Sequence, residues 1–199
     1  MRSQASLSSL AVLAGALLVS MPAAAQFINE IHYDNTGTDA GEAIEVAGPA
    51  GTDMTGWTIV LYNGNDGAVY DTDALSGTIP NQQNGCGTVF LSYPVNGIQN
   101  GAPDGIALVT PGSTVAQFLS YEGAFTAVGG PANGMLSTDI GVSESSGTLV
   151  GDSLQLAGTS GPNCTLGTMT WQGASANTFG AINTGQTLVP VELLSFEIE

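Results

Sequence analysis

The chain has 199 residues and a formal net charge of −16 at pH 7, because seventeen acidic residues face a single basic one. This length fits one domain, and a hydrophobic content of 43% is too high for a disordered chain. The 28 glycines disfavour long helices, and Arg2 alone is too little for binding nucleic-acid phosphates, which takes several basic side chains. Composition therefore predicts a helix-poor domain that does not bind nucleic acid directly.

The first 25 residues have the pattern of a secretory signal peptide. Arg2 gives a short positively charged start, residues 10–19 are apolar, and three alanines ending at Ala25 form a small-residue cleavage site before Gln26. The apolar run is well short of the roughly 20 residues that a membrane-spanning helix needs. We therefore expect cleavage after Ala25, secretion to the extracellular space or the cell surface, and no membrane span.

Cleavage at this site removes the only basic residue of the chain. His32 is then the one side chain that can become cationic, so we expect no intramolecular salt bridge to support the fold. Buried carboxylates must instead be held by backbone N–H groups, hydroxyl groups, water or metal ions, because a buried charge without such partners is strongly destabilising.

Two cysteines, Cys86 and Cys164, lie in glycine-rich segments of the exported chain. A pair of cysteines in an oxidising compartment indicates a disulfide. A redox or metal role is disfavoured, because the chain has no Cys-x-x-Cys pair and a single histidine. We therefore expect a disulfide between Cys86 and Cys164.

Along the chain, short segments of alternating polar and apolar residues are separated by turn sequences such as Asn-Gly and Asp-Gly. One of them should place Trp57, Ile59 and Leu61 on one face of a strand. Strands at this spacing predict an antiparallel β-sandwich, with a closed barrel as the alternative. The predicted strands cover residues 27–33, 42–47, 56–62, 68–71, 88–93, 105–109, 114–121, 153–157 and 168–172.

Several motifs, in this order, resemble the lamin tail domain. They are Phe-Ile-Asn-Glu-Ile at 27–31, Glu-Ala-Ile-Glu-Val at 42–46, Thr-Gly-Trp-Thr-Ile at 55–59, Asp-Gly-Ile-Ala-Leu-Val at 104–109, Gly-Asp-Ser-Leu at 151–154 and Phe-Gly-Ala-Ile-Asn at 179–183. The chain departs from the family at Ala43, where an aromatic residue is usual, and at Phe179, where proline is usual. The resemblance spans about residues 27–187 and implies an immunoglobulin-like β-sandwich.

The same resemblance predicts the domain organisation. A lamin-tail-like domain at residues 26–188 follows the signal peptide at 1–25, and residues 189–199 resemble a junction segment that precedes C-terminal sorting domains in secreted proteins. Bacterial members of the family are often attached to extracellular nucleases, and residues 180–187 are similar to the modules found there. Either a free-standing interaction module or an accessory module of a nuclease system is compatible with these motifs.

The sequence does not favour an enzyme. His32 lies on a predicted strand beside Glu30, and no nucleophile and orienting group can be assigned to it. We interpret His32 as an outward-facing or hydrogen-bonded strand residue. The resemblance implies a non-catalytic secreted module that requires no cofactor and binds a protein or glycan partner.

One group of acidic residues in the sequence has the composition of a metal-binding site. Asp34, Asp39, Glu42 and Glu45 lie close together around a loop rich in glycine, asparagine and threonine. Ca²⁺ takes six to eight oxygen ligands, and carboxylates on a flexible loop can supply them. These four residues are therefore the candidate Ca²⁺ ligands.

The first two predicted strands suggest a register. If they form a hairpin, Glu30 lies opposite Glu45 and Ile31 lies opposite Ile44. Two like charges facing each other across a strand pair are destabilising unless they are solvated, protonated or bridged by a metal ion. The alternative, favoured by the family resemblance, is that both glutamates accept hydrogen bonds from neighbouring loops.

Overall fold

The structure is a computed structural model that describes residues 25–101 and 103–190. Residues 1–24 of the predicted signal peptide and 191–199 of the predicted junction segment lie outside the described residues. No helix in the described part is long and apolar enough to cross a membrane. The elements are the strands β1 (Phe27–His32), β2 (Ala43–Pro49), β3 (Thr58–Asn63), β4 (Val69–Ala74), β5 (Cys86–Ser92), β6 (Asp104–Val109), β7 (Val115–Tyr121), β8 (Thr138–Asp139), β9 (Asp152–Thr159), β10 (Thr170–Ala176) and β11 (Gln186–Thr187), and the 3₁₀ helix η1 (Pro162–Cys164).

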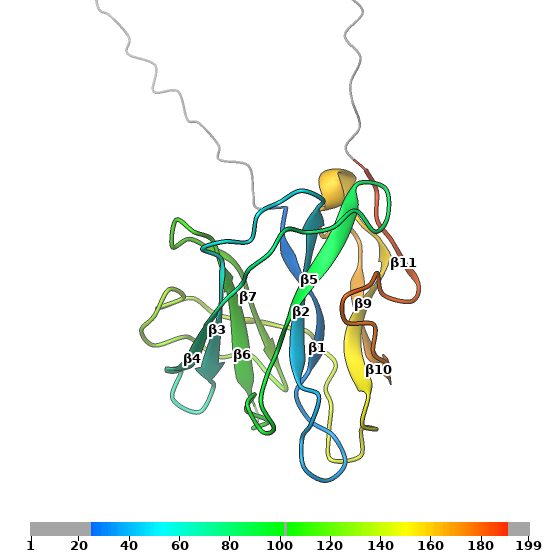
Figure 1. Cartoon of the computed structure of the whole chain (residues 1–199). Helices are drawn as coiled ribbons and strands as arrows, with labels where there is room; N and C mark the ends of the chain where they lie inside the picture. The colour runs from blue at the N-terminus through cyan, green and yellow to red at the C-terminus, as the bar shows by residue number, and fades with distance from the viewer. Residues whose placement is uncertain (1–24, 102, 191–199) are drawn as a thin grey trace, which may run out of the picture.

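The strands form two sheets that pack face to face as an immunoglobulin-like β-sandwich (Figure 1). One sheet has the order β10-β9-β1-β2-β5, with β11 added beside β9, and the other has the order β4-β3-β6-β7-β8. The predicted sandwich is therefore confirmed, and the barrel alternative is wrong. Every predicted strand is present, but the sequence missed β8 and β11. These two-residue strands pair in parallel with β7 and β9, whereas all longer strand pairs are antiparallel.

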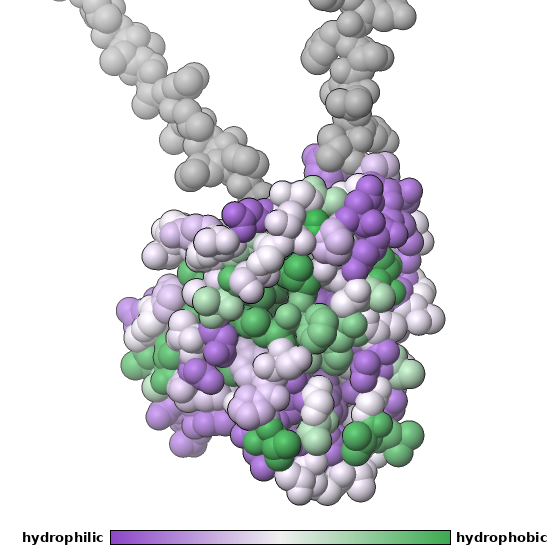
Figure 2. All heavy atoms as spheres, viewed as in Figure 1, coloured by the Kyte–Doolittle hydropathy of each residue, from purple (hydrophilic) through white to green (hydrophobic). Residues whose placement is uncertain are grey.

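Side-chain alternation builds the core between the two sheets. Trp57, Ile59 and Leu61 all point into this core, as predicted. The facing sheet contributes Ile31 and Leu154, among others, to the same cluster. Burying each aliphatic side chain of this size stabilises the folded state by roughly 1.5–3 kcal/mol. Figure 2 shows that hydrophobic residues also reach the surface, near the middle and along the lower and left edges of the face in view, among hydrophilic ones.

The predicted register of the first hairpin is also confirmed. Glu30 pairs with Glu45 and Ile31 pairs with Ile44, and the register shifts by one residue between Ile28 and Glu30. The extra residue at this irregularity, Asn29, lets both isoleucines of β1 face the core. The two glutamates therefore lie on the outer face of their sheet.

The predicted disulfide is present. Cys86, at the start of β5, is bonded to Cys164 in η1, and their Cα atoms are 5.8 Å apart. Both cysteines belong to a small buried cluster with Leu156 and Leu188. Figure 1 places η1 at the end of the sandwich where the described chain begins and ends, so the disulfide fastens this end. The 33–42 loop lies at the opposite end.

Candidate functional site

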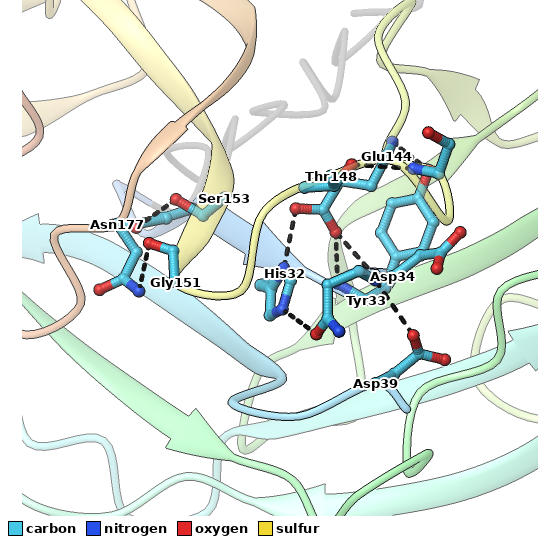
Figure 3. A network of polar contacts seen from close by, with 12 residues as sticks. His32, Tyr33, Asp34, Asp39, Glu144, Thr148, Gly151, Ser153 and Asn177 are labelled. Carbon is cyan, nitrogen blue, oxygen red and sulfur yellow. Dashed lines mark hydrogen bonds and ion pairs between the residues drawn. The ribbon is translucent and has the colours of Figure 1, made fainter. Parts of the chain in front are cut away.

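A cluster of buried charges lies at the end of the sandwich opposite the disulfide, where β1 runs into the 33–42 loop (Figure 3). Glu144, from the segment between β8 and β9, contributes the central carboxylate. Its Oε1 lies 2.8 Å from His32 Nδ1, and its Oε2 accepts hydrogen bonds from the backbone N–H groups of Tyr33, at 2.6 Å, and Asp34, at 3.0 Å. Glu144 thus joins two segments that are far apart in the sequence.

The other ring nitrogen of His32 also faces an oxygen. His32 Nε2 lies 3.1 Å from Asn35 Oδ1, and Asn35 Nδ2 donates to the carbonyl oxygens of Thr36 and Thr38. These two bonds fix the orientation of the Asn35 amide, so that its oxygen faces the ring. Because both nitrogens of His32 face acceptors, the ring is in its doubly protonated, cationic form.

His32 and Glu144 therefore form a buried ion pair, with exposures of 1% and 0%. Burial lowers the pKa of His32, but the hydrogen bond and charge of Glu144 outweigh it and raise the pKa above its ordinary value. Our expectation that no salt bridge supports the fold is wrong at this one place. Among the described residues it is the single ion pair. The interpretation of His32 as a hydrogen-bonded strand residue is confirmed, but its ring is buried rather than exposed.

Three of the four predicted calcium ligands lie near this cluster, and the carboxylates of two of them already accept hydrogen bonds from the protein. Asp39 accepts from the backbone N–H of Asn35 and from Asn100 Nδ2, both at 3.0 Å. Glu42 accepts from the backbone N–H groups of residues 97 and 98, at 2.8 and 2.9 Å. Burial and the nearby charge of Asp39 raise the pKa of Asp34.

Glu45, the fourth predicted ligand, belongs to a different environment, beside Glu30 on the outer face of the sheet. In the described part of the chain, no three acidic, histidine or cysteine side chains are grouped so that they could hold a metal ion. The four carboxylates are thus divided between two places rather than gathered into one site. A Ca²⁺ site at Asp34, Asp39, Glu42 and Glu45 stays a prediction.

The two facing glutamates, both fully buried, accept hydrogen bonds from the segment that follows β10. Glu30 accepts from Ser153 Oγ at 2.6 Å and from the backbone N–H and hydroxyl group of Thr178 at 2.7 and 2.8 Å. Glu45 accepts from Asn29 Nδ2 at 2.8 Å and from the backbone N–H of Gly180 at 2.6 Å. The alternative in which loop donors satisfy both glutamates is therefore confirmed.

This pair makes the stability of the protein depend on pH. Burial, followed by the charge of Glu30, raises the pKa of Glu45 from 4.5 to about 8, against the hydrogen bonds that lower it. A carboxyl group whose pKa is higher in the folded state stabilises that state when protonated, so its contribution is complete below pH 4.5 and is lost as the pH rises through about 8. Burial also raises the pKa of Glu30, so its contribution to stability is likewise lost as the pH rises.

We therefore expect the free energy of unfolding to fall between pH 4.5 and pH 8, as measured by urea denaturation at several pH values. Glu45→Gln should flatten this fall, because glutamine does not titrate. Asp66→Asn, on an exposed turn, is the control and should leave the profile unchanged. A stability that rises over this interval, or a Glu45→Gln profile as steep as that of the wild type, would contradict the assignment.

A second feature is an apolar groove of about 590 Å³ between the two sheets, at the edge formed by β7 and β8 on one side and β9 and β10 on the other. Leu136 and Leu166 lie at the groove and are 68% and 36% exposed. Trp171, which packs against the core, and Asp139 also line it. The remaining lining residues are mainly aliphatic, with Val115, Leu119, Met135, Ile140, Leu156 and Met169 among them.

Sequence reasoning missed both Glu144 and the groove. Glu144 lies in a serine-rich segment without alternation, 112 residues from the histidine it pairs with, so no local signal marks it. The one available clue was that a buried, cationic histidine in a domain without lysine or arginine needs an acidic partner. Trp171 is partly buried against the core while also lining the groove.

Comparisons of this chain with protein-family models, with curated proteins and with solved structures find no match.

Proposed function

We propose that this protein is a secreted, non-catalytic binding module of the lamin-tail type, which binds a protein partner by taking an apolar segment of it into the groove between β7/β8 and β9/β10. The pattern of the first 25 residues supports secretion, and a disulfide is typical of an oxidising compartment. The order of the motifs at residues 27–187 supports the lamin-tail type.

The groove is the observation that carries the proposal. Its volume of about 590 Å³ lies within the range of ligand sites, about 300–1,000 Å³. Aliphatic side chains that border a concave apolar surface, such as Leu136, gain free energy when a partner removes them from water. A glycan would be favoured by polar groups and exposed aromatic rings, whereas this lining is mainly aliphatic, so an apolar peptide segment fits it better.

The charge of the partner follows from the charge of this chain. No residue after Arg2 is a lysine or an arginine, and Asp139 lies in the lining of the groove. An acidic partner is repelled by this surface, whereas lysine or arginine beside the apolar anchors of a partner is attracted to it. The partner segment therefore combines aliphatic or aromatic residues with basic ones.

The non-catalytic part of the proposal is supported by the state of His32. Both of its ring nitrogens are engaged, one by Glu144 and the other by Asn35, and the ring is buried. A general base needs a free nitrogen within reach of its substrate. The one histidine of the chain is thus used to hold the fold together.

The test is a titration of the purified protein with a synthetic peptide of alternating leucine and lysine. We expect the fluorescence of Trp171 to change on binding, because this side chain lines the groove. Leu136→Asp should abolish the response by placing a charge on the apolar surface. Leu149→Asp is the matched control, since Leu149 is 66% exposed and lies outside the groove.

Two further peptides separate the contributions of apolar burial and charge. A serine and lysine peptide keeps the charge but lacks the apolar anchors, and a leucine and glutamate peptide keeps the anchors but reverses the charge. Both should bind more weakly than the leucine and lysine peptide. Equal binding of the serine and lysine peptide, or an undiminished response in Leu136→Asp, would overturn the groove as the binding surface.

A further inference from the structure

The segment after β10 brings a hydroxyl group, a buried carboxylate and a side-chain amide together. Thr178 Oγ1 lies 2.8 Å from Glu30 Oε2 and 3.3 Å from Gln155 Oε1. Glu30 and Gln155 are direct neighbours across the β1–β9 pair, and they are 0% and 3% exposed. A nucleophile, a base and an acyl group are thus held next to one another in a site largely closed to water.

Glu30 is suited to act as the base toward Thr178. Burial raises the pKa of Glu30 above its ordinary value, although Ser153 and Thr178 donate to it. A carboxylate without a neighbouring lysine or arginine in a dry site accepts a proton more readily than one in water. Its hydrogen bond with the hydroxyl of Thr178 gives it direct access to the proton that it would take.

The amide of Gln155 is held so that its nitrogen can leave. Gln155 Nε2 donates to the carbonyl oxygen of Ala176 at 2.8 Å and to Ser153 Oγ at 3.0 Å. Ser153 Oγ in turn donates to Glu30 Oε1 at 2.6 Å. The hydroxyl of Ser153 therefore connects the base to the departing nitrogen and provides a path for returning the proton.

We propose that Thr178 and Gln155 form an intramolecular ester crosslink. Thr178 Oγ1 attacks the amide carbon of Gln155 while Glu30 takes the hydroxyl proton. The new C–O bond forms, the C–N bond breaks, and the proton passes from Glu30 through Ser153 to the nitrogen, which leaves as ammonia. No oxidant, reductant or other reactant is needed, because an alcohol and an amide give an ester and ammonia.

The crosslink suits the composition of this chain. The chain contains no lysine, so a lysine-derived isopeptide crosslink is excluded. A single ion pair joins the described residues of the domain. Holding the reacting groups in place replaces a slow bimolecular reaction by an intramolecular one. The product links Thr178, in the segment after β10, covalently to Gln155 in β9. This holds the segment in place beside the two buried glutamates, Glu30 and Glu45.

The test is mass spectrometry of the full-length secreted protein after reduction, alkylation and digestion with chymotrypsin, which cleaves after Trp171. We expect the peptide with Gln155 and the peptide with Thr178 to remain joined, with a combined mass lower by one ammonia molecule. Locating the loss to this pair is necessary because cyclisation of Gln26 releases ammonia as well. Alkaline hydrolysis of the joined pair should leave glutamate at position 155.

Variants of the same protein test the roles of Thr178 as the nucleophile and Glu30 as the base. Thr178→Val and Glu30→Gln should abolish the crosslink, Thr178→Ser should retain it, and the exposed control Thr170→Val should leave it unchanged. The wild-type result does not depend on whether any variant folds. Separate peptides with an intact Gln155 in the wild-type protein, or a joined pair that persists in Thr178→Val, would overturn the proposal.

Discussion

Replacing both cysteines by alanine is expected to lower the free energy of unfolding by roughly 4 kcal/mol on the loop-entropy relation for a disulfide. The bond closes a long loop, because Cys86 and Cys164 are separated by 78 residues. It also fastens the end of the sandwich where the described chain begins and ends. Urea denaturation of Cys86→Ala/Cys164→Ala beside the wild type measures the effect.

The reduced wild-type protein is the control for this variant. It keeps both sulfur atoms in the buried cluster with Leu156 and Leu188, so it separates loss of the crosslink from loss of side-chain packing. Reduced protein and double variant should lose similar amounts of stability. A loss below about 1 kcal/mol in both, well under the usual range for a native disulfide, would show that the bond does not hold this end together.

A second large loss of stability is expected when His32 is replaced. His32→Leu should lower the free energy of unfolding by about 3–5 kcal/mol, because it leaves the carboxylate of Glu144 buried without a cation. The adjacent acceptor, Asn35 Oδ1, also loses one of its two donors and keeps the backbone N–H of Ala40. Adding Glu144→Gln should recover part of the loss, since glutamine keeps an oxygen for the backbone N–H groups of Tyr33 and Asp34 but carries no charge.

The stabilisation by the His32–Glu144 ion pair depends on pH, and this dependence distinguishes the ion pair from other contributions to stability. The pKa of His32 is raised in the folded state, so its stabilisation is fully present below its ordinary value of 6.5 and is lost as the pH rises through the folded value. In His32→Leu this decline above pH 6.5 should shrink. Asp139→Asn, on an exposed strand end, is the control. A loss below about 1 kcal/mol, typical of an exposed pair rather than a buried one, would contradict the buried ion pair.

The alternation of side chains made much of this fold predictable. The pattern of Trp57, Ile59 and Leu61 identifies a strand and its buried face, because side chains in a strand point alternately to opposite sides. The register of Glu30 with Glu45 was one natural pairing of two consecutive strands, if they form a hairpin around the 33–42 loop. The disulfide followed from a single pair of cysteines in a chain with the pattern of a secretory signal peptide.

What could not be predicted depends on contacts between distant segments. β8 and β11 have two residues each, too few for any alternation. Glu144 meets His32 only because a loop returns to the end of β1. The groove arises where the edges of two sheets stay apart, and its lining comes from four strands and their connections. The predicted calcium ligands separated because Glu45 lies on the outer face of its sheet, away from the loop.

The most direct test of the proposed binding function is an NMR titration of the ¹⁵N-labelled protein with the leucine and lysine peptide. The groove predicts amide shift changes confined to its lining, at Leu136, Asp139 and Trp171 among others, and their loss in Leu136→Asp but not in Leu149→Asp. Changes scattered over the acidic surface, or unaltered by Leu136→Asp, would instead mean non-specific attraction of a basic peptide and would contradict a binding site in the groove.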